Sequence, residues 1–266
     1  MDGRAGDAEP KGPPVVGVVH LAPLPGSPRG GAPLTVIVDA AVRDAEAYRD
    51  GGATALIVEN FGDAPFRKGA VDPHTVAAMA LAVHAVAAAV SLPVGVNVLR
   101  NDAQAALGIA AMAGGSFVRV NVHTGVMVTD QGIVEGEADR SLRYRRELGA
   151  SVAIWADLLV KHAIPLGDQT LEDVARDAVE RGLADAVILT GVATGRPPSP
   201  DDARRVRDVL PGTPIYVGSG VTAGNARAFL PAATGFIVGT WAKLDGKVGN
   251  PVDADRVRRL IDAVRG

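Results

Sequence analysis

Side chains that can transfer protons lie at or shortly after the ends of two apolar stretches of the sequence. Glu59 directly follows one stretch and Asp157 ends the other, with Lys161 and His162 a few residues further on. A carboxylate acts as an acid or base near neutral pH when burial or a neighbouring carboxylate raises its pKa. The predicted catalytic residues are therefore Glu59, Asp157, Lys161 and His162.

Lys161 leaves more than one role open. An amine can bind an anion as a point charge, form a Schiff base, or stand in solvent. We favour anion binding over Schiff base chemistry, because a lysine nucleophile in a barrel usually points inward from a strand and Lys161 lies just beyond one.

Polar side chains recur at the ends of other apolar stretches and predict contacts with a substrate. The asparagines among them suit neutral hydroxyl or amide groups. His20 could instead be a core or loop histidine, and acids in glycine-containing loops, such as Asp63 and Asp130, are often turn formers. The predicted substrate-binding residues are His20, Asn60, Asp63, Asn97, Arg119, Asn121, Asp130 and Thr190.

Glycines follow the last apolar stretches and indicate an anion site. Glycine lets backbone N–H groups approach an anion without a Cβ in the way. The alternative is that these glycines only shape tight turns. The predicted phosphate-binding residues are Gly191, Gly218, Ser219, Gly220, Gly239 and Thr240.

The sequence does not fix a metal requirement. It has no cysteine, so a thiolate site and a disulfide are both excluded. Glu59, Asp63 and Asp157 could hold Mg²⁺ through oxygen ligands, whereas Zn²⁺ or Mn²⁺ would need His20 and His162, which lack a characteristic ligand spacing. Mg²⁺ is therefore the one cofactor kept as a hypothesis.

Eight β-branched stretches alternate with helical patterns, which predicts an α/β fold, a (β/α)₈ TIM barrel of the phosphate-binding type. An open doubly wound sheet is the alternative, but no Gly-x-Gly-x-x-Gly sequence follows the first strand. The predicted strands are 15–21, 53–60, 93–99, 117–122, 151–159, 184–190, 214–220 and 235–241. The predicted helices are 35–50, 73–91, 102–113, 139–148, 170–181, 200–209, 223–229 and 253–264.

The connections of this predicted barrel are unequal. Turns before the strands are short, whereas the segments 22–34, 61–72, 123–138 and 191–200, which follow strands, are long. The active site of a TIM barrel is built from the segments that follow the strands. Each long segment carries glycine and proline and is interpreted as a loop, either a mobile lid or a rigid Ω-loop.

Composition and charge limit which partners and which cellular location are expected for the protein. The formal net charge is −3, so nothing predicts nucleic acid as a partner. Residues 1–14 are predicted to be a disordered tail and 15–266 a single domain. The Ala-rich segment 75–92 is interpreted as a barrel helix, so no transmembrane segment is expected. We expect a cytoplasmic protein that binds a small phosphorylated ligand, and a homo-oligomer because oligomers are common among such barrels.

Several phrases of the sequence resemble the BtpA family, also called the BtpA/SgcQ family. The resemblance runs from about residue 15 to the end. It implies a TIM-like barrel in a family named after a factor needed for photosystem I stability, with other members similar to products of carbohydrate operons. It assigns no catalytic residue. The phrases include residues 20–28, 58–66, 95–102, 117–122, 129–136, 160–163, 190–191 and 218–221.

Two functions follow from these patterns. The first is an enzyme acting on a phosphorylated sugar or nucleoside-like metabolite, by lyase, isomerase or glycosidic-bond chemistry, with phosphate at the loops after the last two strands. The alternative is a non-catalytic accessory or assembly factor for a membrane complex, as the family name implies. That role predicts a large apolar surface patch or a basic amphipathic helix.

Overall fold

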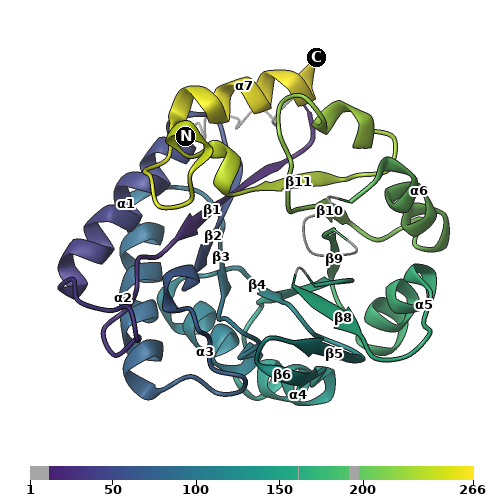
Figure 1. The fold of residues 1–266 in the computed structure, drawn as a ribbon, viewed down its shortest axis with the longest axis horizontal. Coiled ribbons are helices and arrows are strands. Elements are labelled where there is room, and N and C mark those ends of the chain that lie inside the picture. Colours follow the sequence, from purple (N-terminus) through teal and green to yellow (C-terminus); the bar gives the residue numbers. More distant parts are fainter. Residues whose placement is uncertain (1–11, 161, 192–197) are drawn as a thin grey trace, which may run out of the picture.

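The structure is a computed structural model that describes residues 12–160, 162–191 and 198–266. Its central feature is a closed barrel of eight parallel strands, in the spatial order β1-β11-β10-β9-β7-β4-β3-β2. The helices lie around the strands in a ring (Figure 1). The predicted TIM barrel is confirmed, and each of the eight predicted strands is present.

The barrel strands are short and the helices between them are longer. The barrel strands are β1 (Val15–His20), β2 (Ala55–Glu59), β3 (Val94–Asn97), β4 (Phe117–Val120), β7 (Ala153–Asp157), β9 (Ala186–Leu189), β10 (Ile215–Val217) and β11 (Gly235–Val238). The α-helices are α1 (Leu34–Asp50), α2 (Pro73–Ala89), α3 (Ala103–Ala113), α4 (Ala138–Glu147), α5 (Leu171–Arg176), α6 (Pro200–Val209) and α7 (Ala254–Arg265).

The barrel core follows from the two-residue period of the strands. Successive side chains of a strand point to opposite faces, so alternate residues fill the barrel and the others pack under the helices. Val16 and Val18 of β1 belong to the interior cluster, together with Ile57 of β2 and Ile237 of β11. Both faces of each strand are therefore apolar until the strand ends.

Three aromatic rings stack on one another inside the barrel. Trp155 stacks between Phe117 and Tyr216, with ring centroids 3.9 Å and 4.1 Å away. A Cβ on Gly95 would lie 2.2 Å from the Phe117 ring, so only glycine leaves room for this ring on the neighbouring strand. The three rings pack with the apolar side chains of the interior cluster.

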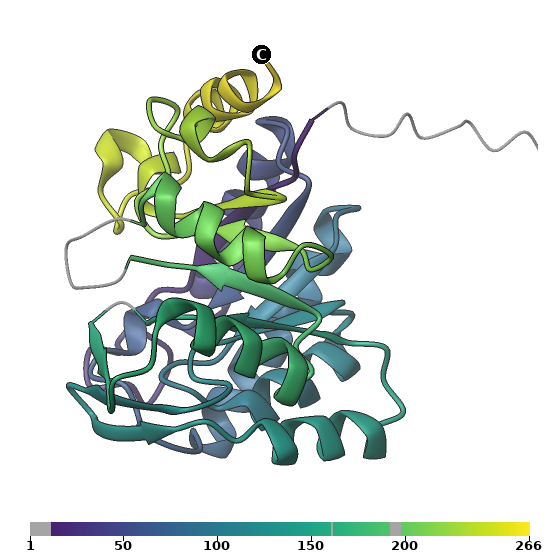
Figure 2. The same cartoon turned by 90° about the vertical axis from the view of Figure 1, so that its right-hand side faces the viewer.

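The segment after β4 corrects one expectation of the sequence. It was interpreted as a long loop, but it forms the hairpin β5 (Val126–Thr129) and β6 (Gly132–Glu135), which pairs with β8 (Ala163–Pro165) in an antiparallel sheet. Val128 pairs with Ile133 and Ile164 across the three strands, and all three side chains are exposed. Figure 2 shows this sheet at the end of the barrel where the strands finish.

Two predicted helices differ in form. The predicted helix 170–181 consists of α5 followed by the π-helical turn η2 (Asp177–Arg181). The predicted helix 223–229 is reduced to the 3₁₀ turn η3 (Ala226–Phe229). Asn225 accounts for this shortening, because its side chain accepts a hydrogen bond from Thr222 N and donates one to Gly220 O. These bonds favour a turn over a first helical turn.

The remaining short helices are 3₁₀ turns beside the barrel mouth. They are η1 (Phe61–Asp63), which follows β2, and η4 (Thr240–Ala242) and η5 (Leu244–Gly246), which follow β11. A buried ion pair between Lys243 and Asp44 holds the segment after β11 against α1. Asp44 also accepts a hydrogen bond from Val252 N at 2.8 Å.

The amino-terminal segment meets the barrel before β1 begins. Residues 1–11 of the predicted tail lie outside the described residues. Pro14, the last residue of the predicted tail, accepts a hydrogen bond at its O atom from Phe236 N at 2.9 Å. Within the described part of the chain, no helix has both the length and the apolar character needed to cross a membrane.

Candidate active site

A cavity of about 370 Å³ opens at the carboxyl ends of the barrel strands. Its polar side combines residues from several strand ends, because parallel strands all finish at this face. The strand register aligns His20 with Glu59 and Glu59 with Asn97. The cavity is lined by His20, Glu59, Arg119, Asn121 and Asp157, with Phe61, Phe66, Leu99, Arg100, Val160, His162, Ser219, Gly220, Val221, Gly239, Thr240 and Trp241 around them.

Asp157 is tied to Arg119 by two hydrogen bonds. Arg119 Nε donates to Asp157 Oδ1 at 3.0 Å, and Arg119 Nη2 donates to Oδ2 at 2.9 Å. Asn121 Nδ2 donates a third bond to Asp157 Oδ2 at 2.8 Å. The Asp157 side chain is fully buried, so these bonds replace the water that it lacks. Asp157 therefore fixes the guanidinium of Arg119.

Glu59 lies next to this pair without joining it. Its Oε2 is 3.7 Å from Arg119 Nη1, and among the described residues its carboxylate accepts no hydrogen bond. Burial raises the pKa of Glu59, the charge of Arg119 opposes that shift, and the charge of Asp157 adds to it. Glu59 is therefore a buried acid with a raised pKa at the cavity, a setting that is common for groups that transfer protons.

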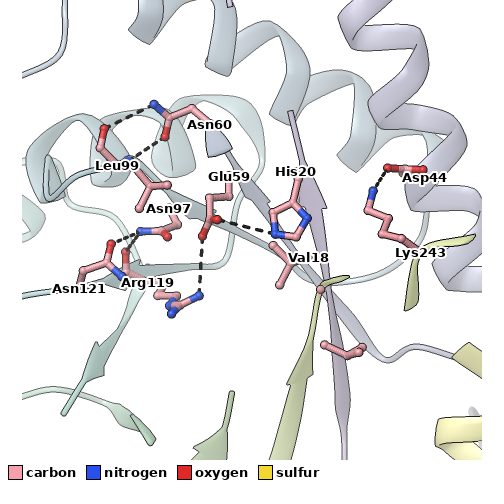
Figure 3. Close-up of polar contacts among 12 residues, drawn as sticks. Val18, His20, Asp44, Glu59, Asn60, Asn97, Leu99, Arg119, Asn121 and Lys243 are labelled. Carbon is pink, nitrogen blue, oxygen red and sulfur yellow. Dashed lines mark hydrogen bonds and ion pairs between the residues drawn. The ribbon is translucent and has the colours of Figure 1, made fainter. Parts of the chain in front are cut away.

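The guanidinium of Arg119 remains charged in this setting. Burial would lower its pKa, but the charges of Asp157 and Glu59 outweigh burial, so the pKa is raised above its ordinary value. Arg119 is thus a permanent cation between two acids (Figure 3).

His20 faces Glu59 from the neighbouring strand (Figure 3). Its Nε2 is 3.9 Å from Glu59 Oε1, and its ring packs against Phe61 with centroids 4.7 Å apart. Burial, with the charges of Lys243 and Arg119 acting in the same direction, lowers the pKa of His20 to about 3. The imidazole is therefore neutral at physiological pH.

Three predicted substrate-binding residues hold the backbone and other side chains instead of lining the cavity. Asn60 accepts a hydrogen bond from Leu99 N at 2.7 Å and donates one to Asp63 at 3.0 Å. Asp63 also accepts a bond from Leu24 N at 2.8 Å. Asn97 donates to Arg119 O at 3.0 Å and to Asn121 Oδ1 at 3.1 Å (Figure 3). These contacts position the strand ends around the cavity.

Backbone groups of two glycine-containing segments line the opposite side of the cavity. Ser219 and Gly220 adopt consecutive positive φ angles of 59° and 86° after β10. A Cβ on Gly239 would lie 2.7 Å from His20 Cε1, so the close approach of His20 requires glycine here. Within the described ranges, Ser219, Gly220, Gly239 and Thr240 donate no backbone–backbone hydrogen bond through their N–H groups.

The other predicted site residues lie at different places. His162 lines the cavity, whereas Lys161 lies outside the described residues. Thr190 is fully buried and donates its hydroxyl to Leu159 O. Asp130 lies in the turn between β5 and β6. Gly191 and Gly218 are buried and are not part of the cavity lining.

Sequence reasoning missed Arg100 and the aromatic wall. Arg100 lines the cavity just beyond β3 and is only 8% exposed. Burial lowers its pKa, and the charges of Asp157 and Asp130 act in the opposite direction. Phe61, Phe66 and Trp241 form aromatic parts of the lining. The position of Arg100 directly after a predicted strand was the one signal that pointed to it.

The described residues contain no cluster of three or more acidic or histidine side chains placed to hold a metal ion. Asp63 is bonded to Leu24 N and Asn60, and Asp157 to Arg119 and Asn121. The three acids proposed as Mg²⁺ ligands thus do not converge.

Comparison of solved structures shows the fold. The phosphoribosylanthranilate isomerase of Pyrococcus furiosus superposes with a TM-score of 0.57 at 13% identity, covering 95% of this chain and 98% of the other. Tryptophan synthase of M. tuberculosis superposes with a TM-score of 0.60 at 18% identity, covering 97% and 94%. At this identity the likeness extends to the barrel architecture.

Comparison of sequences gives the family. The chain is 50% identical over 251 residues to the photosystem I biogenesis protein BtpA of Synechocystis sp., covering 94% of this chain and 88% of that protein. It is 34% identical over 264 residues to a protein of Caenorhabditis elegans described as mitochondrial, covering 95% and 93%. The BtpA family profile matches residues 11–266. The chain belongs to the BtpA family.

Proposed function

We propose that the protein is an enzyme acting on a phosphorylated sugar or nucleoside-like metabolite. The observation that carries this proposal is one cavity with two unlike walls. The first wall carries a buried acid, Glu59, with a raised pKa. The second wall presents backbone N–H groups that have no backbone partner among the described residues. The first wall suits proton transfer and the second suits an anion. The name of one structural neighbour, a phosphoribosylanthranilate isomerase, supports a phosphorylated substrate.

The phosphate is assigned to the loops after β10 and β11. Ser219, Gly220, Gly239 and Thr240 line the cavity there. Phosphate sites of TIM barrels are frequently formed by the loops after the last two barrel strands. The positive φ angles of Ser219 and Gly220 support a concave backbone that directs N–H groups to an anion. Gly191 and Gly218 are buried outside the cavity lining and are not assigned a contact with the phosphate.

The reacting part of the substrate is assigned to the charged wall. Glu59 serves as the acid or base, and Arg119, held by Asp157, binds a substrate oxygen. His162 lines the cavity and stays in the proposed catalytic set, as does Lys161 on sequence grounds alone. The aromatic side chains Phe61 and Trp241 offer an apolar surface to a sugar face or a planar ring.

The accessory role has less support. The relative named for photosystem I biogenesis is its main argument. Two of the basic residues of α7 are engaged within the chain, because Arg258 pairs with Asp255 and Arg256 lies 4.9 Å from the centroid of the Trp241 ring.

The phosphate site is tested by ligand-induced stabilisation. Ribose 5-phosphate, glucose 6-phosphate and adenosine monophosphate are compared with ribose, glucose and adenosine, with and without Mg²⁺. At least one phosphorylated compound should raise the unfolding temperature while its parent does not. Ser219→Asp should remove this effect by repulsion, and Ser219→Asn is the matched control because both residues tolerate the positive φ of 59°.

The proposal fails if Ser219→Asp and Ser219→Asn respond equally to every phosphorylated compound, or if no phosphorylated compound stabilises more than its parent. For the compound that is turned over, Glu59→Gln should lower kcat about 10²–10⁴-fold. Glu135→Gln, on the exposed strand β6, is the control and should leave kcat unchanged.

A further inference from the structure

The side chains of His20 and Glu59 are close but not bonded to each other. The 3.9 Å between His20 Nε2 and Glu59 Oε1 is longer than a hydrogen bond. Both residues line the cavity, and Figure 3 shows their polar atoms directed toward one another from β1 and β2. An oxygen atom at about 2.8 Å from both groups fits such a gap. The pair therefore frames a position for a substrate atom.

The second ring nitrogen of His20 indicates where its proton is. Among the described residues, Nδ1 is buried and has no hydrogen-bond partner. A neutral imidazole carries one proton, and a buried N–H without an acceptor is costly. The proton is therefore placed on Nε2, the nitrogen that faces Glu59. His20 is a hydrogen-bond donor toward the cavity.

The surroundings keep this donor neutral. Burial of His20 is the main cause, the cations Lys243 and Arg119 act in the same direction, and Glu59 is the acid next to it. Lys243 is paired with Asp44, and Arg119 with Asp157, so both cations are fixed. A neutral imidazole can polarise a carbonyl oxygen without giving its proton away prematurely.

A second donor lies beside the other oxygen of the acid. Arg119 Nη1 lies 3.7 Å from Glu59 Oε2, while the Nε and Nη2 of Arg119 are occupied by Asp157. The acid is thus flanked by one neutral and one charged donor. This arrangement suits a reaction in which a proton moves to the acid while negative charge grows on a neighbouring oxygen.

We propose that Glu59, His20 and Arg119 catalyse proton transfer at the carbon next to the carbonyl of a phosphorylated α-hydroxycarbonyl compound. This inference rests on the proposed function and narrows its substrate class. Glu59 takes the C–H proton, the bonding pair forms a C=C bond, and the carbonyl π pair moves to oxygen. His20 Nε2–H binds this oxyanion, and Arg119 Nη1–H binds the neighbouring hydroxyl oxygen. Return of the proton to the former carbonyl carbon, with the hydroxyl proton passing to the oxyanion, gives the isomer.

The proton position is tested by nitrogen NMR of protein labelled with ¹⁵N-histidine. The His20 signals are assigned by their loss in His20→Gln. They should show the neutral Nε2–H form throughout pH 5.5 to 8. An imidazolium or an Nδ1–H form in this range would overturn the inference. The measurement uses the wild-type chain, so it does not depend on the folding of the variant.

The role toward the substrate is tested with 2-phosphoglycolate, in which a carboxylate mimics the charge of the enediolate and a phosphate is attached. We expect it to shift the His20 ring signals, and its Kd to rise about tenfold in His20→Gln by calorimetry. His84→Gln, on the exposed face of α2, is the control. Equal Kd values in wild type and His20→Gln would contradict the inference.

Inorganic phosphate separates this inference from the proposed function. It should bind the wild type and His20→Gln with equal Kd, because its proposed contacts are only the backbone N–H groups after β10 and β11. Failure of the wild type to bind inorganic phosphate would remove the proposed phosphate site. The tautomer of His20 would still test by itself whether His20 is a neutral Nε2–H donor toward the cavity.

Discussion

The two walls of the cavity are built on different principles. The wall formed at the ends of β1, β2, β4 and β7 consists of long side chains that fix one another, with Arg119 and Asn121 both bound to Asp157. The wall after β10 and β11 presents backbone at Ser219, Gly220, Gly239 and Thr240, with the ring of Trp241 beside them. In the proposed function, the first wall selects the substrate through charge and proton position, and the second wall binds the phosphate.

The difference also shows how each wall is held. The charged wall depends on mutual hydrogen bonds, so removal of one partner leaves others buried and unpaired. The backbone wall depends on the segments below it, such as the buried Lys243–Asp44 pair that holds the turn after β11. Substitutions should therefore destabilise the charged wall more strongly than the backbone wall.

Arg119→Met should give the largest loss of stability. It leaves the fully buried Asp157 side chain without its ion-pair partner, which costs about 3–5 kcal/mol of unfolding free energy. Urea unfolding measures the loss. Arg205→Met is the matched control, because Arg205 holds Glu172 by the same two-bond geometry at the surface. A loss no greater than in Arg205→Met would show that the charged wall is not interdependent.

His20→Gln should flatten the acid side of the stability profile. The folded state keeps His20 neutral down to about pH 3, whereas the unfolded chain protonates it below its ordinary pKa of 6.5. The unfolded state therefore binds more protons in this window, and wild-type stability falls as the pH falls from 6.5 toward 3. Between pH 7.5 and 5, the variant should lose about 2 kcal/mol less than the wild type.

The pH series is made by urea unfolding at fixed ionic strength. His84→Gln, which changes an exposed histidine of α2, should follow the wild-type profile. A His20→Gln profile parallel to that of the wild type would mean that His20 is not held neutral by the charged wall.

Tyr48→Phe should have the smallest effect. The buried Tyr48 hydroxyl lies 3.2 Å from Val18 O and 3.1 Å from Val238 O, and so joins β1 of the charged wall to β11 of the backbone wall. Its loss should cost about 1 kcal/mol. Thermal unfolding monitors the change, with Tyr144→Phe as the control. A Tyr48→Phe protein as stable as the wild type would show that this hydroxyl does not stabilise the contact between β1 and β11.

The sequence predicted the barrel well because its signals are repeated. Eight apolar stretches, each with a helical segment after it, leave few arrangements that bury every strand on both faces. The antiparallel sheet of β5, β6 and β8 was missed, because Asp130 and Gly132 were interpreted as loop residues and β8 has only three residues. The hairpin has a two-residue turn, a signal too local to outweigh those residues.

Only part of the site could be predicted from the sequence, namely the residues whose position follows from the pattern of the strands. Glu59, Asp157 and Arg119 stand at strand ends, and the two-residue period places them inside the barrel. The roles of Asn60 and Asp63 depend on contacts with Leu99 and Leu24, which are distant in sequence. Such partners become visible only when the chain is folded.

A crystal structure with inorganic phosphate tests the account most directly. Wild-type crystals soaked in millimolar phosphate should show it within hydrogen-bond distance of the N–H groups of Ser219, Gly220, Gly239 and Thr240, across the cavity from Glu59. Crystals of Ser219→Asn should show the same, and those of Ser219→Asp should not. Phosphate bound at Arg119 and Arg100 instead, with the backbone loops empty, would contradict the assignment of the two walls.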